Sequence, residues 1–448
     1  MNTTLDHIKN VYFIGIGGIG MSALARYFKF SDKNVAGYDK TPTKLTSELQ
    51  AIGIEIHFDD NVDYIPQTFQ NSNDTLIVYT PAVPKDHLQL TYFKKQGYIV
   101  KKRAEVLGII TQDTYTLAVA GTHGKTTTTA ILAHLLKASG IKVTAFLGGI
   151  SENYNSNLIL EGTDVVVVEA DEFDRSFMQL YPDIVAITSM DADHLDIYEQ
   201  ADQLEQSFIE FSDRAKDHLL VASGLPLNGL TFGLRDASDY SAQKIRIDNG
   251  TYIFDLKTPK QYIKNVALTL PGDHNLLNAI VAFAMALLFG VSIENLVKAL
   301  STFKGVQRRF TYQIKTDNKV FIDDYAHHPT EINALNQAIR QMHPNKKVLG
   351  VFQPHLYSRT RDFAAAFAES LSLFDELLLL DIYPARETSI PGITSSWLLN
   401  MISCEKKKVI EKKDLIIEIK KSDAHVIVTI GAGDIGAEVE PIKNALLV

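Results

Sequence analysis

The stretch TYTLAVAGTHGKTTTTAILAHLLKASG, residues 114–140, decides the fold of the middle of this chain. An apolar run precedes a glycine-bearing turn, and a long helical pattern follows it. This strand–turn–helix order is the context that a phosphate-binding P-loop requires. The match to the full P-loop pattern is imperfect, because Val119 stands at the first glycine position. We interpret residues 121–127 as a phosphate site; the alternative is a helix start that binds nothing.

Each polar residue of this turn has an expected role. Backbone N–H groups and the helix N-terminus cradle phosphates. Lys125 is expected to neutralise the β- and γ-phosphates, and Thr126 to hold Mg²⁺. The residues predicted to bind the nucleotide here are Gly121, Thr122, Gly124, Lys125, Thr126 and Thr127.

Carboxylates follow the next apolar strand, in VVVVEADEFD. They are Glu169, Asp171, Glu172 and Asp174. A carboxylate beside a P-loop can bind or orient Mg²⁺, although a polar strand end is the simpler explanation. Asp193 and His194 follow the strand after that, where ligands of open α/β sheets lie. The alternative for His194 is an ordinary loop histidine.

A second glycine turn opens the chain, in FIGIGGIGMS, residues 13–22. Gly15, Gly17 and Gly20 have the G-x-G-x-x-G spacing of a dinucleotide-binding turn, and Asp39 stands where an acidic residue would bind ribose. A dehydrogenase that binds NAD would use such a turn. However, it has no use for Lys125 and Thr126, so the separate nucleotide site counts against NAD.

Length and composition limit the number of domains, the classes of partner and the cellular compartment that can be expected. The chain has 448 residues, too many for one core, and about three domains are expected. Its net charge of −9 argues against general nucleic-acid or membrane-surface binding. The single cysteine, Cys404, excludes an internal disulfide and fits a reducing compartment. The start lacks a signal-peptide pattern, and the apolar segment 279–291 is too short to span a bilayer, so we expect a cytoplasmic protein.

Alternating strand and helix patterns predict an α/β protein of three domains. We expect a Rossmann-like domain at 1–111, a P-loop domain with a parallel sheet at 112–309, and a second Rossmann-like domain at 310–448. Asn249-Gly250 predicts a small antiparallel insertion in the middle domain, and residues 309–326 form a hairpin candidate. We also expect a helix over 275–290 and a solvated charged stretch over 404–414.

Taken in order along nearly the whole chain, the motifs resemble those of the Mur ligase family of peptidoglycan synthesis. They are GIGGIGMS, GTHGKTTTT, VEADEFD, DADHLDIY, PGDHNLLNA, GVQRRF, DDYAHHPTEI, FQPHLYSRTR and IGAGDI. The resemblance implies domains that bind a UDP-sugar, ATP and an amino acid, in that order. Within the family, the motifs look most like the enzyme that adds L-alanine to UDP-N-acetylmuramate. There the lactyl carboxylate attacks the γ-phosphate of ATP, and the amine of L-alanine then attacks the acyl phosphate.

The resemblance also implies site residues. For the UDP-sugar they are Gly15, Gly17, Gly18, Ile19, Gly20, Ser22, Asp39 and Thr80. The expected ATP-binding residues include, besides those of residues 121–127, His274, Asn278, Arg309 and Asp324. The expected Mg²⁺ ligands are Thr126, Glu169 and His194. For the amino acid they are Tyr325, His327, His328, His355 and Arg359. The expected catalytic residues are Lys125, His194, His355 and Arg359. Arg308 could share the role of Arg309, and otherwise is a solvated charge.

Two residues depart from the family pattern. Leu356 stands where an arginine is frequent, and Tyr38 stands where a small serine is frequent. The motifs YPARE and IPGITS suggest a mobile substrate loop, to which no contacts can be assigned from sequence.

Three alternative functions remain open. One is the related ligase that recycles a murein tripeptide onto the same sugar nucleotide. The others are an NAD-dependent dehydrogenase with a regulatory ATP site and a non-catalytic P-loop switch. For the ligase we expect no nucleic-acid partner, no membrane insertion, and a monomer or weak homodimer.

Overall fold

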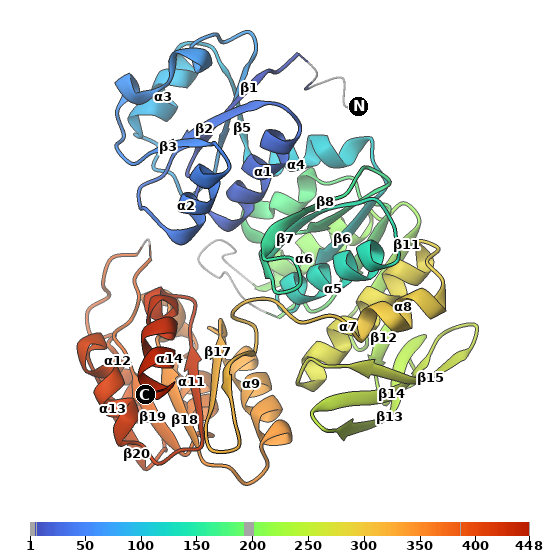
Figure 1. The fold of residues 1–448 in the computed structure, drawn as a ribbon, viewed down its shortest axis with the longest axis vertical. Coiled ribbons are helices and arrows are strands. Elements are labelled where there is room, and N and C mark those ends of the chain that lie inside the picture. Colours follow the sequence, from blue (N-terminus) through green and yellow to red (C-terminus); the bar gives the residue numbers. More distant parts are fainter. Residues whose placement is uncertain (1–4, 6, 192–200, 386, 448) are drawn as a thin grey trace. The chain divides into compact units, whose positions relative to one another are not determined.

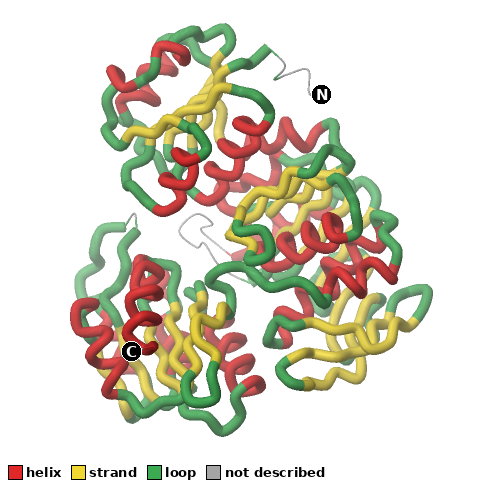
Figure 2. The backbone as a smooth tube through the Cα atoms, viewed as in Figure 1, coloured by secondary structure: helices red, strands yellow, loops and turns green. Residues whose placement is uncertain are grey.

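The computed structural model of the chain describes residues 5, 7–191, 201–385 and 387–447, and its strands form three sheets flanked by helices (Figures 1 and 2). This arrangement confirms the predicted three-domain α/β fold. By their contacts the residues divide into two compact units. The first unit holds 1–244, 255–266 and 278–303, and the second holds the remaining residues.

The N-terminal sheet has the strand order β3-β2-β1-β4-β5, and all its pairs are parallel. Its strands are β1 (Asn10–Ile14), β2 (Asn34–Tyr38), β3 (Glu55–His57), β4 (Thr75–Tyr79) and β5 (Ile99–Lys102). Its helices are α1 (Ile19–Phe30), α2 (Lys44–Ala51), α3 (Leu88–Lys95) and α4 (Arg103–Gln112). The order reverses between β1 and β4, which is the switch point where ligands of such sheets bind.

The middle sheet is built around β6 (Thr116–Ala120), which lies between β9 (Val165–Glu169) and β10 (Ile184–Ile187) and is parallel to both. β6 and β10 are buried throughout, and only Glu169 at the end of β9 is partly exposed, as expected for strands covered on both faces. The other strands of the parallel part and its edge hairpin are β7 (Val143–Ser151), β8 (Ser156–Leu160), β11 (His218–Ala222) and β12 (Leu230–Leu234). Helices of this region are α5 (Lys125–Ala138), α6 (Ala201–Ser212), α7 (Asp273–Leu288) and α8 (Ile293–Leu300).

The predicted insertion is present as β13 (Tyr240–Asp248), β14 (Thr251–Lys257) and β15 (Tyr262–Leu268). The turn between β13 and β14 consists of Asn249 and Gly250, whose φ angles are 46° and 79°. Two successive positive φ angles characterise the tight two-residue hairpin turn that Asn-Gly favours. Helix α7 starts two residues before the predicted start at 275 and ends two residues before 290.

The C-terminal sheet has the order β16-β17-β21-β18-β19-β20. Its strands are β16 (Thr311–Lys315), β17 (Val320–Asp324), β18 (Val348–Phe352), β19 (Glu376–Leu379), β20 (Lys406–Val409) and β21 (Val426–Ile430). Its helices are α9 (Pro329–Met342), α10 (Tyr357–Asp362), α11 (Ala364–Leu371), α12 (Ser395–Met401), α13 (Leu415–Lys421) and α14 (Val439–Leu447). Only the β16–β17 pair is antiparallel, which confirms the predicted hairpin.

The segment 404–414 has a structure that was not predicted. Most of its charged side chains are exposed, as expected for a solvated charged stretch, but residues 406–409 also form strand β20 at the edge of the sheet. An edge strand keeps one side in water, so lysines are tolerated there and discourage pairing with other chains.

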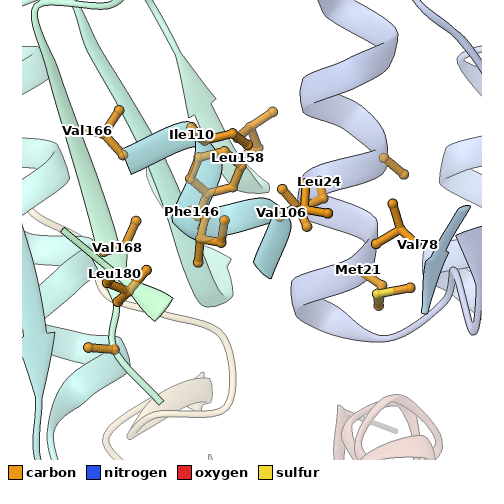
Figure 3. Packing of buried hydrophobic residues seen from close by; sticks show 14 of the residues in the cluster. Met21, Leu24, Val78, Val106, Ile110, Phe146, Leu158, Val166, Val168 and Leu180 are labelled. Carbon is orange, nitrogen blue, oxygen red and sulfur yellow. The ribbon is translucent and has the colours of Figure 1, made fainter. Parts of the chain in front are cut away.

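A continuous hydrophobic core joins the N-terminal and middle sheets within the first unit (Figure 3). Met21 and Leu24 of α1 belong to it together with Val106 of α4, Phe146 of β7 and Leu158 of β8. The helix that follows the first glycine turn is therefore packed against the domain that carries the P-loop. In the second unit the cores on the two faces of the C-terminal sheet are separate. Among the described residues, no helix combines the length and apolarity needed to cross a bilayer.

Candidate active site

The phosphate loop lies between β6 and α5. Gly121 and Gly124 have φ angles of 129° and 83°, which favour glycine. A Cβ atom would fall 2.1 Å from the Thr188 Oγ1 atom at Gly121, and 2.4 Å from the Asn278 Oδ1 atom at Gly124. Gly124 caps α5 without a side-chain hydrogen bond. The first N–H groups of α5 thus form an N-terminus of the kind that binds phosphate.

Lys125 is the first residue of α5, and its Nζ atom folds back over the loop. It donates to the Gly121 carbonyl oxygen at 2.6 Å and lies 2.8 Å from the Glu172 Oε2 atom. Burial lowers the pKa of Lys125, but the carboxylates of Glu172, Asp171 and Glu169 together hold it above its ordinary value. Lys125 is therefore a cation at neutral pH, as its predicted role requires. Its pairing with the fully buried Glu172 side chain was not predicted.

Thr126 and Glu169, two of the three predicted magnesium ligands, are in contact. The Thr126 hydroxyl donates to the Glu169 Oε1 atom at 3.1 Å. Gly148 of β7 leaves room for this carboxylate, because a Cβ atom there would fall 2.0 Å from the Glu169 Oε2 atom. A hydroxyl beside a carboxylate suits a hard cation such as Mg²⁺. The third predicted ligand, His194, and its neighbour Asp193 lie outside the described residues.

The remaining carboxylates of the VEADEFD motif bind the N-terminal domain. Asp171 lies 3.4 Å from the Arg103 Nη2 atom, and Asp174 lies 2.7 Å from the Lys102 Nζ atom. The predicted cluster of four therefore divides into two pairs. Glu169 and Glu172 lie at the phosphate loop, and Asp171 and Asp174 pair with cations at the start of α4. Within the described ranges, no group of three or more His, Cys, Asp or Glu side chains is arranged to hold a metal.

The other predicted residues of the loop have structural contacts. The Thr122 hydroxyl donates to the Asp191 carbonyl oxygen at 2.9 Å, and Thr127 is buried in the first turn of α5. Asn278 of α7 is also buried and lies against Gly124, next to the loop where it was predicted to act.

The first glycine turn connects β1 to α1. Gly15 has a φ angle of 86°, and a Cβ atom there would fall 2.9 Å from the Thr80 Cγ2 atom. Asp39, at the end of β2, accepts a hydrogen bond from the Gly17 N–H group at 2.7 Å. Asp39 therefore braces the turn itself, while its contact to ribose remains a prediction. Gly18 precedes α1 without a side-chain cap.

Three further residues of the turn differ in their exposure. Ile19 is exposed, whereas Ser22 is buried and its hydroxyl accepts a hydrogen bond from Asn157 of β8 at 2.8 Å. A Cβ atom at Gly20 would fall 2.9 Å from the Arg103 Nη1 atom. Arg103 thus places a cation at the start of α1, and sequence reasoning missed it because nothing marks the segment KKRAE as part of a site.

Tyr38, which stands where a small serine is frequent in the family, packs edge-on against His87 with ring centres 4.7 Å apart.

In the second unit, His274 is held neutral at the start of α7. Burial, and next the charge of Arg309, lower its pKa to about 4. Gly272 makes room for the ring, since a Cβ atom there would fall 2.5 Å from the His274 Cε1 atom. His274 and Asn278 are four residues apart and so share one face of α7. The contact of His274 with the nucleotide remains a prediction.

The pKa of His274 predicts acid sensitivity. A folded-state pKa of about 4, below the ordinary 6.5, means that stability is fully present above pH 6.5 and is lost as the pH falls towards 4. At pH 5, protonation of His274 lowers the free energy of unfolding by about 2 kcal/mol. Urea unfolding at pH 7.5 and pH 5 should therefore show a smaller loss for His274→Gln than for the unmodified chain. The exposed His218→Gln is the control, and equal losses for all three proteins would contradict the prediction.

Arg308 and Arg309 are adjacent but face different partners. The Arg308 guanidinium donates to the Asp323 Oδ2 atom at 3.2 Å and to the Gly431 carbonyl oxygen at 2.6 Å. Its interpretation as a solvated charge was wrong, because Asp323 is buried within the C-terminal sheet. Both guanidinium groups lie over the Tyr325 ring, 5.1 Å from its centre for Arg308 and 5.3 Å for Arg309. The carboxylate next to Arg309 is that of Glu331, 3.6 Å away. Arg309 remains the arginine predicted to contact the nucleotide.

Asp324 ends β17 and is buried. Its Oδ2 atom accepts from the Phe310 N–H group at 2.7 Å, and its Oδ1 atom accepts from the Ala326 N–H group at 2.8 Å. Burial raises the pKa of Asp324 to about 6, although Arg309 and these two hydrogen bonds oppose the rise. Asp324 therefore ties the segment after Arg309 to the loop that carries Tyr325.

Three of the five predicted amino-acid ligands lie together. The ring centres of Tyr325 and His327 are 5.5 Å apart, and those of His327 and His355 are 6.1 Å apart. His328 is buried and caps α9, accepting from the Thr330 N–H group at 3.3 Å. Arg359 is buried on α10, in the turn that follows His355. His328 thus has a structural role in the helix cap, and its contact with a substrate remains a prediction.

Comparison with known families matches nearly the whole chain. Residues 10–115 match the family model described as Mur ligase family, catalytic domain. Residues 119–286 match the Mur ligase middle domain, and residues 308–433 match the Mur ligase, glutamate ligase domain.

Full-length relatives are similar in sequence. The UDP-N-acetylmuramate–L-alanine ligase of Christiangramia forsetii is 62% identical over 446 residues, covering 99% of both chains. The protein of the same name from Flavobacterium psychrophilum is 63% identical over 444 residues, again covering 99% of both.

Solved structures share the fold. The crystal structure of UDP-N-acetylmuramate-alanine ligase from Thermotoga maritima has a TM-score of 0.82 and 27% identity, covering 98% of this chain and 99% of that one. A murein peptide ligase from Psychrobacter arcticus has a TM-score of 0.71 and 22% identity, covering 98% of both chains.

Proposed function

Because the chain belongs to the Mur ligase family, we propose that it joins L-alanine to the lactyl carboxylate of UDP-N-acetylmuramate in an ATP-dependent reaction. Relatives 62% and 63% identical over the full length carry the name of this ligase. The structural observation that carries the proposal is the presence of two separate glycine turns. Each precedes a helix whose N-terminus has no side-chain cap, α1 in one case and α5 in the other. One suits the diphosphate of a UDP-sugar and the other the phosphates of ATP.

In the first step of this reaction a carboxylate attacks the γ-phosphate, which gives an acyl phosphate and ADP. Two anions repel each other, so the site must supply positive charge where the transition state develops negative charge. Lys125 and the N–H groups of α5 supply it from this chain. Thr126 and Glu169 are the described residues that would hold Mg²⁺, whose charge would further screen the phosphates.

In the second step the amine of L-alanine attacks the acyl carbon, and phosphate leaves. Arg359 is the proposed partner of the alanine carboxylate, because a guanidinium binds a carboxylate with two parallel hydrogen bonds. His355 is proposed to orient the amine or to accept its proton, a role suited to imidazole. His327, with its ring next to His355, is the second candidate for the proton.

The alternative functions have weaker support. The solved murein peptide ligase shares the fold at 22% identity, whereas two full-length relatives named for L-alanine are 62% and 63% identical. An NAD-dependent dehydrogenase needs neither Lys125 nor the Thr126–Glu169 pair. The cytoplasmic location expected from the single cysteine is part of the proposal.

Phosphate release tests the proposed function directly. The purified chain is incubated with ATP, Mg²⁺, UDP-N-acetylmuramate and one acceptor: L-alanine, glycine, L-serine or the murein tripeptide. We expect release with L-alanine that also requires the UDP-sugar. Release with the tripeptide alone would establish the recycling reaction instead, and ATP hydrolysis without the UDP-sugar would indicate a P-loop switch.

A further inference from the structure

The YPARE motif contributes two residues, Tyr383 and Glu387, that contact the short segment carrying His355 and Arg359. The Tyr383 N–H group donates to the Pro354 carbonyl oxygen at 2.8 Å, and the Leu356 N–H group donates to the Tyr383 carbonyl oxygen at 2.9 Å. These bonds form a parallel bridge between His355 and Tyr383. The backbone on both sides of His355 is therefore fixed by one residue.

The side chains of this pair are also in contact. The His355 and Tyr383 rings are stacked, with centres 5.7 Å apart and planes 20° apart. On another side of Tyr383, a Cβ atom at Gly433 would fall 2.8 Å from the Tyr383 Cβ atom. Tyr383 is thus confined next to the Gly433 backbone, and its ring sets the plane of the imidazole.

Glu387 contacts the other end of the segment that carries His355 and Arg359, at the start of α10. Its Oε2 atom accepts from the Ser358 N–H group at 3.0 Å, and its Oε1 atom accepts from the Ser358 hydroxyl. Ser358 is in the first turn of α10, and the residue before that helix gives it no side-chain cap. The Glu387 carboxylate, from a loop distant in sequence, therefore accepts a hydrogen bond from a backbone N–H group in the first turn of α10. Its negative charge is also favourable at the positive end of the helix dipole. Arg359 is the next residue along α10.

The backbone between the two ends is strained. Leu356, between His355 and α10, has φ 71° and ψ 135°, a conformation that residues other than glycine rarely adopt. Such a residue costs about 1–3 kcal/mol and persists only where its surroundings enforce it. Here the Tyr383 carbonyl holds the Leu356 N–H group, and the Thr360 hydroxyl donates to the Leu356 carbonyl at 2.7 Å. The orientation of His355 relative to Arg359 therefore depends on contacts from outside the segment.

We propose that Tyr383 and Glu387 are positioning residues of the amino-acid site, which hold His355 and Arg359 in the arrangement that binds the amine and carboxylate of the acceptor. This inference rests on the proposed function. Tyr383 fixes the orientation of the His355 imidazole through ring stacking. Glu387 fixes the position of the Arg359 guanidinium by holding the start of α10 in place. Both act on the second step, the attack of the amine, and leave the phosphate loop unchanged.

Steady-state kinetics of Tyr383→Ala and Glu387→Ala test the proposal. We expect the KM for L-alanine to rise by about tenfold to 100-fold, because a displacement of about 1 Å can cost that much. The KM values for ATP and UDP-N-acetylmuramate should stay within about twofold, since neither variant touches the P-loop. Tyr383→Phe keeps the ring and should restore the normal KM for L-alanine. Glu369→Gln, at an exposed position of α11, is the matched control for the carboxylate.

Two measurements keep the result interpretable. Positional isotope exchange in ATP with UDP-N-acetylmuramate reports the first step alone and should be unchanged in both variants. If Glu387→Ala fails to fold, Ser358→Ala removes only the hydroxyl bond and should raise the same KM by a smaller factor. An unchanged KM for L-alanine in Tyr383→Ala, or equal rises in all three KM values, would overturn the inference. A wild-type chain without L-alanine-dependent release would instead overturn the proposed function.

Discussion

Lys125→Ala should lower L-alanine-dependent phosphate release by about 100- to 1,000-fold, which is the usual cost of removing one charge-stabilising donor from a catalytic site. Lys125 is the first residue of α5, and its Nζ atom is held over the phosphate loop by the Gly121 carbonyl at 2.6 Å. The affinity for UDP-N-acetylmuramate should change little, because the first glycine turn is formed by other residues.

The pairing of Lys125 with Glu172 complicates this variant. The Glu172 side chain is fully buried, so removing its cation leaves a buried charge, which costs about 3–5 kcal/mol. Lost activity could therefore reflect a damaged loop. The double variant Lys125→Ala/Glu172→Gln removes both charges and should recover most of the melting temperature without recovering activity.

The control is Lys137→Ala in the last turn of the same helix. Lys137 pairs with Glu161 at the surface, where such pairs contribute about 0–1 kcal/mol. It should leave phosphate release and melting temperature unchanged. If the double variant regained substantial ligation, Lys125 would be a structural partner of Glu172 and not a phosphate ligand. Loss of UDP-sugar binding in Lys125→Ala would contradict two separate sites.

Local patterns made the P-loop predictable. β6, the glycine turn and α5 are consecutive, so their geometry follows from the residues themselves. Thr126 and Glu169 could also be anticipated, because β6 and β9 are adjacent parallel strands whose carboxyl ends meet. By contrast, β8, β12 and β20 have no strong pattern of their own and depend on pairing with neighbouring strands.

Where two residues of the same type are adjacent in the sequence, the sequence does not show which of them faces the candidate site. Arg308 has a φ angle of 61°, and its carbonyl accepts from the Tyr325 N–H group at 2.7 Å. Both guanidinium groups lie over the Tyr325 ring, but Arg308 pairs with Asp323 whereas Arg309 lies 3.6 Å from the Glu331 carboxylate. In the same way His328 caps α9, whereas His327 lies next to His355.

Contacts between distant loops were also beyond prediction. Ser358 and Glu387 are 29 residues apart, and Arg103 and Asp171 are 68 residues apart. No local pattern links either pair. Tertiary packing within the C-terminal domain brings Glu387 to Ser358, and packing of the N-terminal domain on the middle domain brings Arg103 to Asp171. Motifs therefore predicted the residues of the two glycine turns, whereas the contacts of Glu387 with Ser358 and of Asp171 with Arg103 became visible only in the structure.

Asp324→Ala should lower the turnover number by about 100-fold, the cost expected when catalytic groups shift by about 1 Å. The two oxygen atoms of Asp324 hold the Phe310 and Ala326 N–H groups, and the variant leaves both donors buried without this acceptor. Arg309 lies next to one of these anchored groups and Tyr325 next to the other. Both should lose their fixed positions. Asp317→Ala, in the exposed turn at the other end of the same hairpin, should have no effect.

Asp324→Asn separates this positioning from the stability of the domain. The pKa of Asp324 is raised from 3.8 to about 6, so the ionised group lowers the stability of the fold by about 3 kcal/mol at pH 7 relative to its protonated form. Asparagine removes that cost but loses one acceptor, worth about 1–3 kcal/mol. Its melting temperature at pH 7 should therefore stay close to that of the unmodified chain, while its turnover falls between those of Asp324→Ala and the wild type. Normal turnover in Asp324→Ala would remove Asp324 from the site, and an Asp324→Asn variant as inactive as Asp324→Ala would show that the charge itself is required.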